Sequence, residues 1–266
     1  MLHSGKEPAV LVVEAGNTTT TFAVFLDGLV ADTVTITTDS LFVPDQLQEL
    51  LHPFRAAYPG MRDAVLCSVV PGVSAAVVGQ LAQLLPGTVM QVGSRLNLPF
   101  LLQYDSPESF GADRIALCAA GRQLFPGKAV IALDIGTAIT FDVLDGCGSY
   151  LGGFIMPGLD LMARSLHERT AQLPLVAIAP PEELLGRSTA ECIRNGIFWG
   201  CVSQIDGLTA RIMKTLMDQG QVAPAVMATG GNAPAVAPLL RVETLLVEHA
   251  VARGAHYLYQ LNRPCL

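Results

Sequence analysis

The chain has 266 residues, and 51% of them are hydrophobic, which is enough to bury the cores of one large or two small domains without disulfide support. Its formal net charge is −7, with only 16 Lys and Arg scattered along it, so it lacks the clustered basic residues that a nucleic-acid partner requires. The six cysteines form no CxxC pair and no Cys/His ligand spacing. We therefore expect reduced thiols, as in a cytoplasmic protein.

No segment is predicted to cross a membrane. The apolar run 9–13 is too short for a signal peptide and ends at Glu14. Residues 64–94 carry no charge, but the pairs Pro71-Gly72 and Pro86-Gly87 interrupt them. This stretch is better explained as a buried strand, a turn and a short apolar helix.

The first half of the chain begins with three apolar or β-branched segments, 9–13, 18–25 and 30–37, separated by glycine turns. They predict an antiparallel meander of three strands. Further periodicity predicts a helix at 46–51, a buried strand at 64–70, a helix at 73–85, an extended segment at 97–104 and a helix at 115–124. Pro126 and Gly127 then mark the best domain boundary.

The second half repeats the meander. Strands are predicted at 129–134, 138–144 and 149–155, followed by a helix to about Arg169, a helix at 190–217, a strand at 225–229 and a final helix at 248–261. Thr189 is placed to cap the long helix. Gly196 and Gly200 share a face of that helix and would let another helix approach, within the subunit or across a dimer. We predict two domains, 8–125 and 126–266.

The first turn of each meander combines a carboxylate, a glycine and hydroxyls. Glu14, Gly16, Asn17 and Thr18 stand against Asp134, Gly136, Thr137 and Ala138 in the second copy. A glycine without a Cβ lets backbone N–H groups approach a phosphate, and the acid can hold a cation or water. The alternative is an ordinary glycine hairpin, but the repetition and a third turn, Gly230-Gly231, favour a phosphate site.

A second candidate site is the pair Asp113-Arg114, which lies just before a helix and after a segment with Tyr104. The aspartate could accept a hydroxyl proton, and the arginine could hold a carboxylate. A surface helix cap beside a solvated arginine is the alternative. Walker-type spacing, a dinucleotide GxGxxG, a GxSxG elbow and an HExxH motif are all absent from the sequence, so those classes are disfavoured.

Together these motifs resemble a type III pantothenate kinase. The pieces, in chain order, are Glu14-Ala-Gly-Asn-Thr18, Gly111-Ala-Asp-Arg114, Asp134-Ile-Gly-Thr-Ala138 with Thr140 and Asp142, Tyr150-Leu-Gly-Gly-Phe-Ile-Met-Pro-Gly158, and Thr170-Ala-Gln-Leu-Pro174. The resemblance implies the acetate and sugar kinase, Hsp70 and actin superfamily. The expected fold is α/β, with two ribonuclease-H-like domains in tandem and ATP in the cleft between them.

The resemblance also implies the activity and its partners: phosphorylation of pantothenate by ATP, in the first step of coenzyme A synthesis, by a homodimer. The expected cofactors are Mg²⁺ with ATP and a monovalent cation, K⁺ or NH₄⁺. Asp113 matches the catalytic base and Asp134 the monovalent-cation ligand. Glu14 would contact Mg²⁺, although the family has aspartate there and glutamate is one methylene longer.

The remaining site residues follow from the same resemblance. Those matching pantothenate contacts are Tyr104, Gly111, Ala112, Arg114 and Thr189, the last near the dimer interface. Those matching nucleotide contacts are Glu14, Ala15, Gly16, Asn17, Thr18, Thr19, Thr20, Thr21, Gly136, Thr137, Gly230 and Gly231.

Two other hypotheses stay open on the sequence. One is a non-catalytic, nucleotide-binding regulatory or accessory relative, in which Glu14 has weakened metal binding. The other is a kinase of the same superfamily that acts on a sugar or a short acid. The segment 247–254 differs from what the family leads us to expect, and no role is assigned to it.

Overall fold

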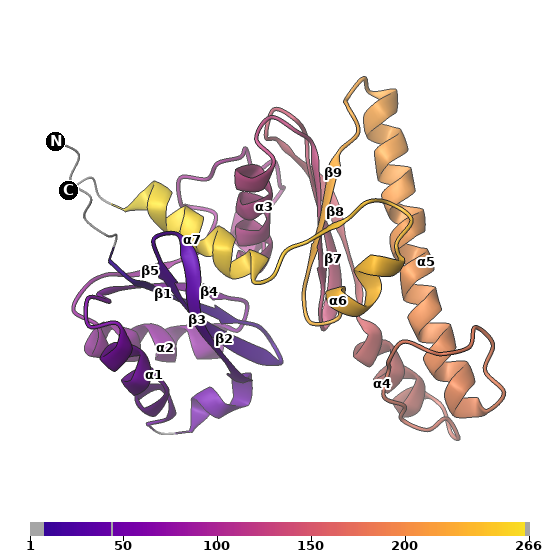
Figure 1. Ribbon diagram of the computed structural model, residues 1–266, viewed down its shortest axis with the longest axis horizontal. Helices are drawn as coiled ribbons and strands as arrows, with labels where there is room; N and C mark the ends of the chain where they lie inside the picture. The colour runs from indigo at the N-terminus through magenta and orange to yellow at the C-terminus, as the bar shows by residue number, and fades with distance from the viewer. Residues whose placement is uncertain (1–7, 44, 264–266) are drawn as a thin grey trace. The chain divides into compact units, whose positions relative to one another are not determined.

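The computed structural model describes residues 8–43 and 45–263, so Cys265 lies outside the described part. The chain divides into two compact units (Figure 1). One unit runs up to Gln123 and takes in the chain again from Ala250, and the other is Leu124–His249.

The first unit contains a mixed sheet of five strands in the order β3-β2-β1-β4-β5. Its strands are β1 (Val10–Ala15), β2 (Thr19–Leu26), β3 (Leu29–Thr37), β4 (Asp63–Ser68) and β5 (Val89–Gln91). Strands β1 to β3 form the predicted antiparallel meander, and β4 pairs parallel with β1. The short strand β5 was not predicted, because its three residues give no periodicity to detect.

Helices cover both faces of this sheet. They are α1 (Gln46–Ala57), α2 (Pro71–Leu84), α3 (Ala112–Leu124) and α7 (Ala250–Asn262). Leu47, Leu51 and Phe54 of α1 pack with Leu81 of α2 into one core beneath the sheet. Helix α1 continues through Pro53 and is longer than the predicted 46–51.

Helix α7 closes the opposite face of the first sheet (Figure 1). The His256 ring stacks on Phe25 of β2 with centroids 4.4 Å apart, and the Tyr259 hydroxyl donates to Asp63 at 2.7 Å. These contacts hold α7 in the first unit, whereas the sequence analysis placed residues 250–266 in the second domain. The reason is tertiary: the apolar face of α7 has its partners in β1 and β4, far away in sequence.

The second unit repeats the first sheet strand for strand, in the order β10-β9-β6-β7-β8. Its strands are β6 (Val130–Ile135), β7 (Ala138–Leu144), β8 (Tyr150–Pro157), β9 (Ala225–Thr229) and β10 (Leu245–Leu246). Strands β6 to β8 form the second meander, and β9 pairs parallel with β6 as β4 does with β1. The duplication predicted from the sequence is therefore confirmed in the pairing.

The helices of the second unit are α4 (Leu159–Arg169), α5 (Thr189–Asp218) and the short α6 (Ala233–Val236). Short 3-10 turns complete the chain at Thr38–Phe42, Pro107–Ser109 and Ala237–Leu239. Ile193, Ile197, Cys201 and Ile205 form an apolar stripe on α5 at helical spacing, and they pack on the sheet with Phe141. Burial raises the pKa of the Cys201 thiol to about 11, so this cysteine is an inert core residue.

Candidate active site

The first glycine turn joins β1 to β2. Strand β1 extends through Glu14, whose Cα pairs with those of Thr21 and of Cys67 in β4. The Gly16 N–H donates to the carbonyl of Thr19 at 3.0 Å and closes the turn. Asn17, Thr18 and Thr19 are exposed, whereas Ala15 and Thr20 are buried within the strands. The turn thus offers its three middle residues to a ligand.

The pairing of the strands corrects the alignment of the two turns. Ala15 pairs with Thr20 in the first meander, and Ile135 pairs with Ile139 in the second. Four residues therefore lie between the paired positions in the first turn, and three lie between them in the second. Thr18 is then the counterpart of Thr137, not of Ala138, and Asn17 is the extra residue.

Asp113 lies in the first turn of α3 and near Glu14. Burial raises the pKa of the Cys67 thiol well above its ordinary value, and the charges of Glu14 and Asp113 raise it further, which places both carboxylates around this thiol. The pKa of Asp113 itself is raised, because its burial outweighs the Arg114 N–H, 2.7 Å from Oδ1, and the Arg114 charge. A carboxylate with a raised pKa is suited to accepting a proton.

Gly111 makes room for this carboxylate. A Cβ on Gly111 would lie 2.5 Å from Oδ1 of Asp113, closer than any real contact. A side chain in place of this glycine of the GADR motif would therefore displace the Asp113 carboxylate from its position.

Arg114 and Tyr104 both contact Phe110. The Arg114 guanidinium carbon lies 4.5 Å from the Phe110 ring centroid, and the Tyr104 ring meets Phe110 edge-on at 4.9 Å. Arg114 is 8% exposed and Tyr104 is 39% exposed. The structure thus brings the two predicted substrate residues together through Phe110, which the sequence analysis missed although it immediately precedes GADR.

A groove of about 940 Å³ opens beside this helix start, within the first unit. Gly111 and Ala112 line one side of it. Ser68 and Ser74, whose hydroxyls are 2.8 Å apart, and the exposed Arg95 also line it. Its volume suits a small organic molecule. Nothing in the local sequence marked these three residues, because β4, α2 and residues 91–96 meet only in the folded unit.

The second glycine turn encloses the side chain of Asp134. A Cβ on Gly136 would lie 3.4 Å from Asp134 Oδ1, and a Cβ on Gly230 would overlap the same oxygen. Gly230 also has a φ of +98°, a backbone conformation that other residues rarely adopt. Both the lack of space for a Cβ and this φ therefore favour glycine at position 230. Gly231 follows it and is exposed, as is Thr137. The glycines predicted as nucleotide contacts thus pack around the predicted cation ligand.

The buried hydroxyl of Thr140 adds a second oxygen to this place. Thr140 pairs with Asp134 across β6 and β7, so the two side chains lie on the same face of the sheet. Within the described residues, Thr140 Oγ1 is buried with no hydrogen-bond partner. A carboxylate and a hydroxyl in a glycine-lined cradle form a donor set that suits a cation with oxygen ligands.

Thr189 does not cap α5, contrary to the prediction. Ser188 is the N-cap: its hydroxyl accepts from the Glu191 N–H at 3.2 Å, and the Glu191 carboxylate accepts from the Ser188 N–H at 3.2 Å. The sequence Ser-x-x-Glu is a capping box and could have identified this start. Thr189 is the first helical residue and is exposed, which leaves its hydroxyl free of a capping role.

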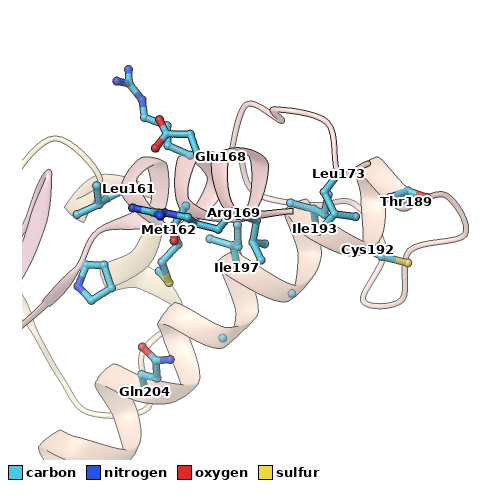
Figure 2. A pocket seen from close by; sticks show the side chains of 16 residues that line it. Leu161, Met162, Glu168, Arg169, Leu173, Thr189, Cys192, Ile193, Ile197 and Gln204 are labelled. Carbon is cyan, nitrogen blue, oxygen red and sulfur yellow. The ribbon is translucent and has the colours of Figure 1, made fainter. Parts of the chain in front are cut away.

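Thr189 instead lines a groove of about 1030 Å³ between α4 and α5. Figure 2 shows Thr189 and Cys192 at one end of this groove and Gln204 toward the other. Gly196 and Gly200 lie between them, and a Cβ on either would meet nothing within 4 Å. Within the described part of the chain, no second helix approaches α5 closely at these glycines, so this face of α5 is open there.

Among residues 8–43 and 45–263, no group of three or more His, Cys, Asp or Glu side chains could hold a metal ion. No helix in the same ranges combines the length and the apolar character needed to cross a membrane.

Solved structures share this architecture. A Baf family protein from Campylobacter jejuni superimposes with a TM-score of 0.60 at 18% identity, over 94% of this chain and 97% of that one. Component A of (R)-2-hydroxyglutaryl-CoA dehydratase from Acidaminococcus fermentans gives a TM-score of 0.53 at 15% identity, over 95% and 97%. At these identities the likeness concerns the fold, and it confirms the predicted actin-like fold.

Sequence comparison is more specific. The family model for type III pantothenate kinase matches residues 10–211. A type III pantothenate kinase of Chlorobium luteolum is 51% identical over 99% of this chain and 97% of its own. Another, from Chlorobaculum parvum, is 51% identical over 95% and 94%. The chain therefore belongs to the type III pantothenate kinase family.

Proposed function

We propose that this protein transfers the γ-phosphoryl group of ATP to the primary hydroxyl of pantothenate, giving 4'-phosphopantothenate and ADP in the first step of coenzyme A synthesis. Family membership supports the reaction. The observation that carries the mechanism is the half-buried carboxylate of Asp113, with its raised pKa, beside a groove of substrate size.

In this proposal Asp113 accepts the proton of the hydroxyl as its oxygen bonds to the γ-phosphorus and the bond to the β-phosphate oxygen breaks. A general base works best when its pKa lies near the working pH, and the raised pKa of Asp113 moves it in that direction. Arg114 and Tyr104, joined through Phe110, bind pantothenate together with the backbone of Gly111 and Ala112. Thr189 adds a hydroxyl at the α4–α5 groove.

The glycine turns supply the phosphate contacts. Phosphoryl transfer asks the protein mainly to position its substrates and to neutralise charge, which N–H groups and hydroxyls can do. We assign the nucleotide to the residues of these turns and of the strand that follows the first one: Glu14, Ala15, Gly16, Asn17, Thr18, Thr19, Thr20, Thr21, Gly136, Thr137, Gly230 and Gly231. Ala15 and Thr20, being buried, act through their main chain or their neighbours.

Each metal ion is assigned to the side-chain oxygen atoms that could bind it. Asp134 with the unpartnered Thr140 hydroxyl would hold a monovalent cation, K⁺ or NH₄⁺, which supplies positive charge near phosphate. Glu14 would contact Mg²⁺ that arrives with ATP. Mg²⁺ keeps several waters and takes one or two carboxylates plus substrate phosphates, so it needs no larger acidic cluster.

We further propose that the protein is a cytoplasmic homodimer and that a second copy covers the α4–α5 groove. Gly196 and Gly200 leave the backbone of α5 accessible there, and Leu161, lining the groove from α4, is 45% exposed. An exposed apolar surface of this kind, formed by two neighbouring helices, is typical of an interface with another protein chain.

A turnover assay tests the function. Purified protein with ATP, Mg²⁺ and K⁺ should release ADP only when pantothenate is present, and omission of Mg²⁺ should stop the reaction. Sugars and short carboxylic acids in place of pantothenate serve as the specificity panel. Turnover with one of those and none with pantothenate would refute the substrate assignment. No turnover with any alcohol, although ADP binds, would favour the non-catalytic alternative.

A further inference from the structure

Thr38 is a buried hydroxyl beside the first glycine turn, and it belongs to no predicted site. It follows β3 directly and is 2% exposed. Its N–H donates to the carbonyl of Thr18 at 3.0 Å, and its hydroxyl donates to the carbonyl of Gly16 at 2.7 Å. Its Oγ1 also lies 3.0 Å from Oγ1 of Thr20. One residue just beyond β3 therefore contacts three residues of the turn and of the strand that follows it.

The direction of these hydrogen bonds can be assigned. A threonine hydroxyl has a single proton, and that of Thr38 goes to the Gly16 carbonyl. Thr20 must therefore donate to Thr38 in the remaining contact. The result is a directed chain from Thr20 through Thr38 to Gly16, in which the buried hydroxyl of Thr38 both accepts and donates.

The brace determines where the N–H groups of the turn point. In a planar trans peptide the carbonyl and the N–H point in opposite directions, and the described chain has no cis peptide bond. The carbonyls of Gly16 and Thr18 point toward Thr38, so the N–H groups of Asn17 and Thr19 point away from it. Both residues are exposed. Two N–H groups that point outward from one turn can both donate to an anion.

The second unit shows the same position without the hydroxyl. Gly158 directly follows β8, as Thr38 follows β3, and its N–H donates to the Thr137 carbonyl at 2.9 Å. Gly158 packs so closely on the Gly136 carbonyl that a Cβ would overlap it. Main-chain packing thus braces the shorter turn. The first turn has one residue more, and there a side-chain hydroxyl reaches the corresponding carbonyl.

We propose that Thr38 is a positioning residue for the phosphate turn of the first unit. It acts through Gly16 and Thr18 and holds the N–H groups of Asn17 and Thr19 in the direction that binds a phosphate of ATP. This inference rests on the proposed function, because it takes the turn to be a nucleotide site.

The test compares three variants. Thr38→Val keeps the shape and removes the hydroxyl, and Thr38→Ser restores it. Thr244→Val is the matched control, because it removes a threonine hydroxyl that donates to a main-chain carbonyl at 3.0 Å, that of Val242, within the second unit and outside every residue assigned to the nucleotide. Steady-state kinetics with each substrate varied give KM for ATP and for pantothenate, and calorimetry gives Kd for ADP.

Thr38→Val should raise KM for ATP and Kd for ADP by about tenfold, the effect of losing one buried hydrogen bond and leaving its acceptor unpaired. KM for pantothenate should stay within about twofold of the wild-type value, and Thr38→Ser should recover most of the loss. Thr244→Val should leave all three constants unchanged. Thr20→Val, which removes only the donor to Thr38, should raise KM for ATP by a smaller factor and serves if Thr38→Val does not fold.

Several results would overturn the proposal. An unchanged KM for ATP in Thr38→Val, or an equal rise of both KM values that serine does not rescue, would leave Thr38 a merely structural residue while the kinase function stood. A wild-type protein that neither binds ADP nor turns over pantothenate would instead refute the proposed function, and the role of Thr38 with it.

Discussion

At the scale of single residues, Asp113 links activity to stability. Its pKa is raised in the folded protein, chiefly by burial, so the folded state binds the proton more tightly than the unfolded chain does. The ionised carboxylate therefore opposes folding, and this cost appears as the pH rises through the interval just above the ordinary value of 3.8. If Asp113 is the proposed base, this acid is kept at the expense of stability.

Asp113→Asn should lower kcat by about 10²- to 10⁴-fold, since it removes a general base. Its free energy of unfolding relative to the wild type should increase as the pH rises from about 4 to 7, because the amide never ionises. Urea denaturation at several pH values measures this difference. Asp160→Asn, in the exposed first turn of α4, is the control for a carboxylate outside the site. A near-normal kcat would exclude Asp113 as the base.

Gly230, in the third glycine turn, leaves no room for a side chain. Gly230→Ala should destabilise the protein by about 1–3 kcal/mol, because its φ of +98° is strained for alanine and the methyl group would overlap Asp134 Oδ1. Thermal unfolding measures the change. Gly231→Ala, where a Cβ meets nothing within 4 Å, should have a much smaller effect on the melting temperature. Equal effects of the two substitutions would contradict this account.

At the scale of elements, the approach of α7 to α3 depends on Gly254. A Cβ at this position would overlap the Ala116 carbonyl of α3 and lie 3.1 Å from the Ala120 nitrogen. Helix α3 begins with the GADR segment, so the packing of α7 bears directly on the position of Asp113. The segment to which the sequence analysis assigned no role thus contains a glycine that lets α7 pack closely on α3.

Gly254→Ala should therefore cost about 1–3 kcal/mol of stability, the usual effect of overpacking, and should lower kcat as α3 is displaced. Chemical denaturation and steady-state kinetics check both effects. Gly79→Ala in α2 is the matched control: its Cβ meets nothing, so the better helix propensity of alanine should stabilise the protein by about 0.5–1 kcal/mol. If both variants were stabilised, the close packing would be refuted.

Substitutions at the start of α5 can test whether Ser188, and not Thr189, caps this helix. Ser188→Ala should destabilise the protein by about 0.5–2 kcal/mol, because two N–H groups of the capping box lose their arrangement. Thr189→Ala should change the stability by less than about 0.5 kcal/mol, since Thr189 is exposed and caps nothing. Thermal melts of the two variants separate the positions, and the reverse order would restore Thr189 as the cap.

At the scale of the whole molecule, the open face of α5 predicts association. Gly200→Glu places a charge where a Cβ has free space within the single chain, so the fold should persist while the proposed dimer dissociates. Light scattering coupled to size exclusion measures the mass. Arg211→Glu, exposed on the same helix but outside the groove, is the control. A wild-type protein that runs as a monomer, or a Gly200→Glu variant that stays dimeric, would contradict the prediction.

Much of the fold could be predicted from the sequence because its signals are local. Alternating apolar residues and glycine turns marked both meanders, and the spacing of GADR and DIGTA identified the family. The errors arose where two signals competed at short range. Thr189 was favoured over the neighbouring Ser188 as the cap, and the two turns were aligned by residue type although only the strand pairing reveals the extra Asn17.

By itself, the sequence determined the duplicated α/β architecture and the family, since these depend on local periodicity and motif spacing. Only the tertiary structure decided that α7 belongs with the first sheet, that Glu14 and Asp113 share one environment, and that Thr38 braces the first turn. Each of these depends on contacts between segments distant in the chain. Side-chain and carbonyl directions at such contacts are set by packing, which no local pattern encodes.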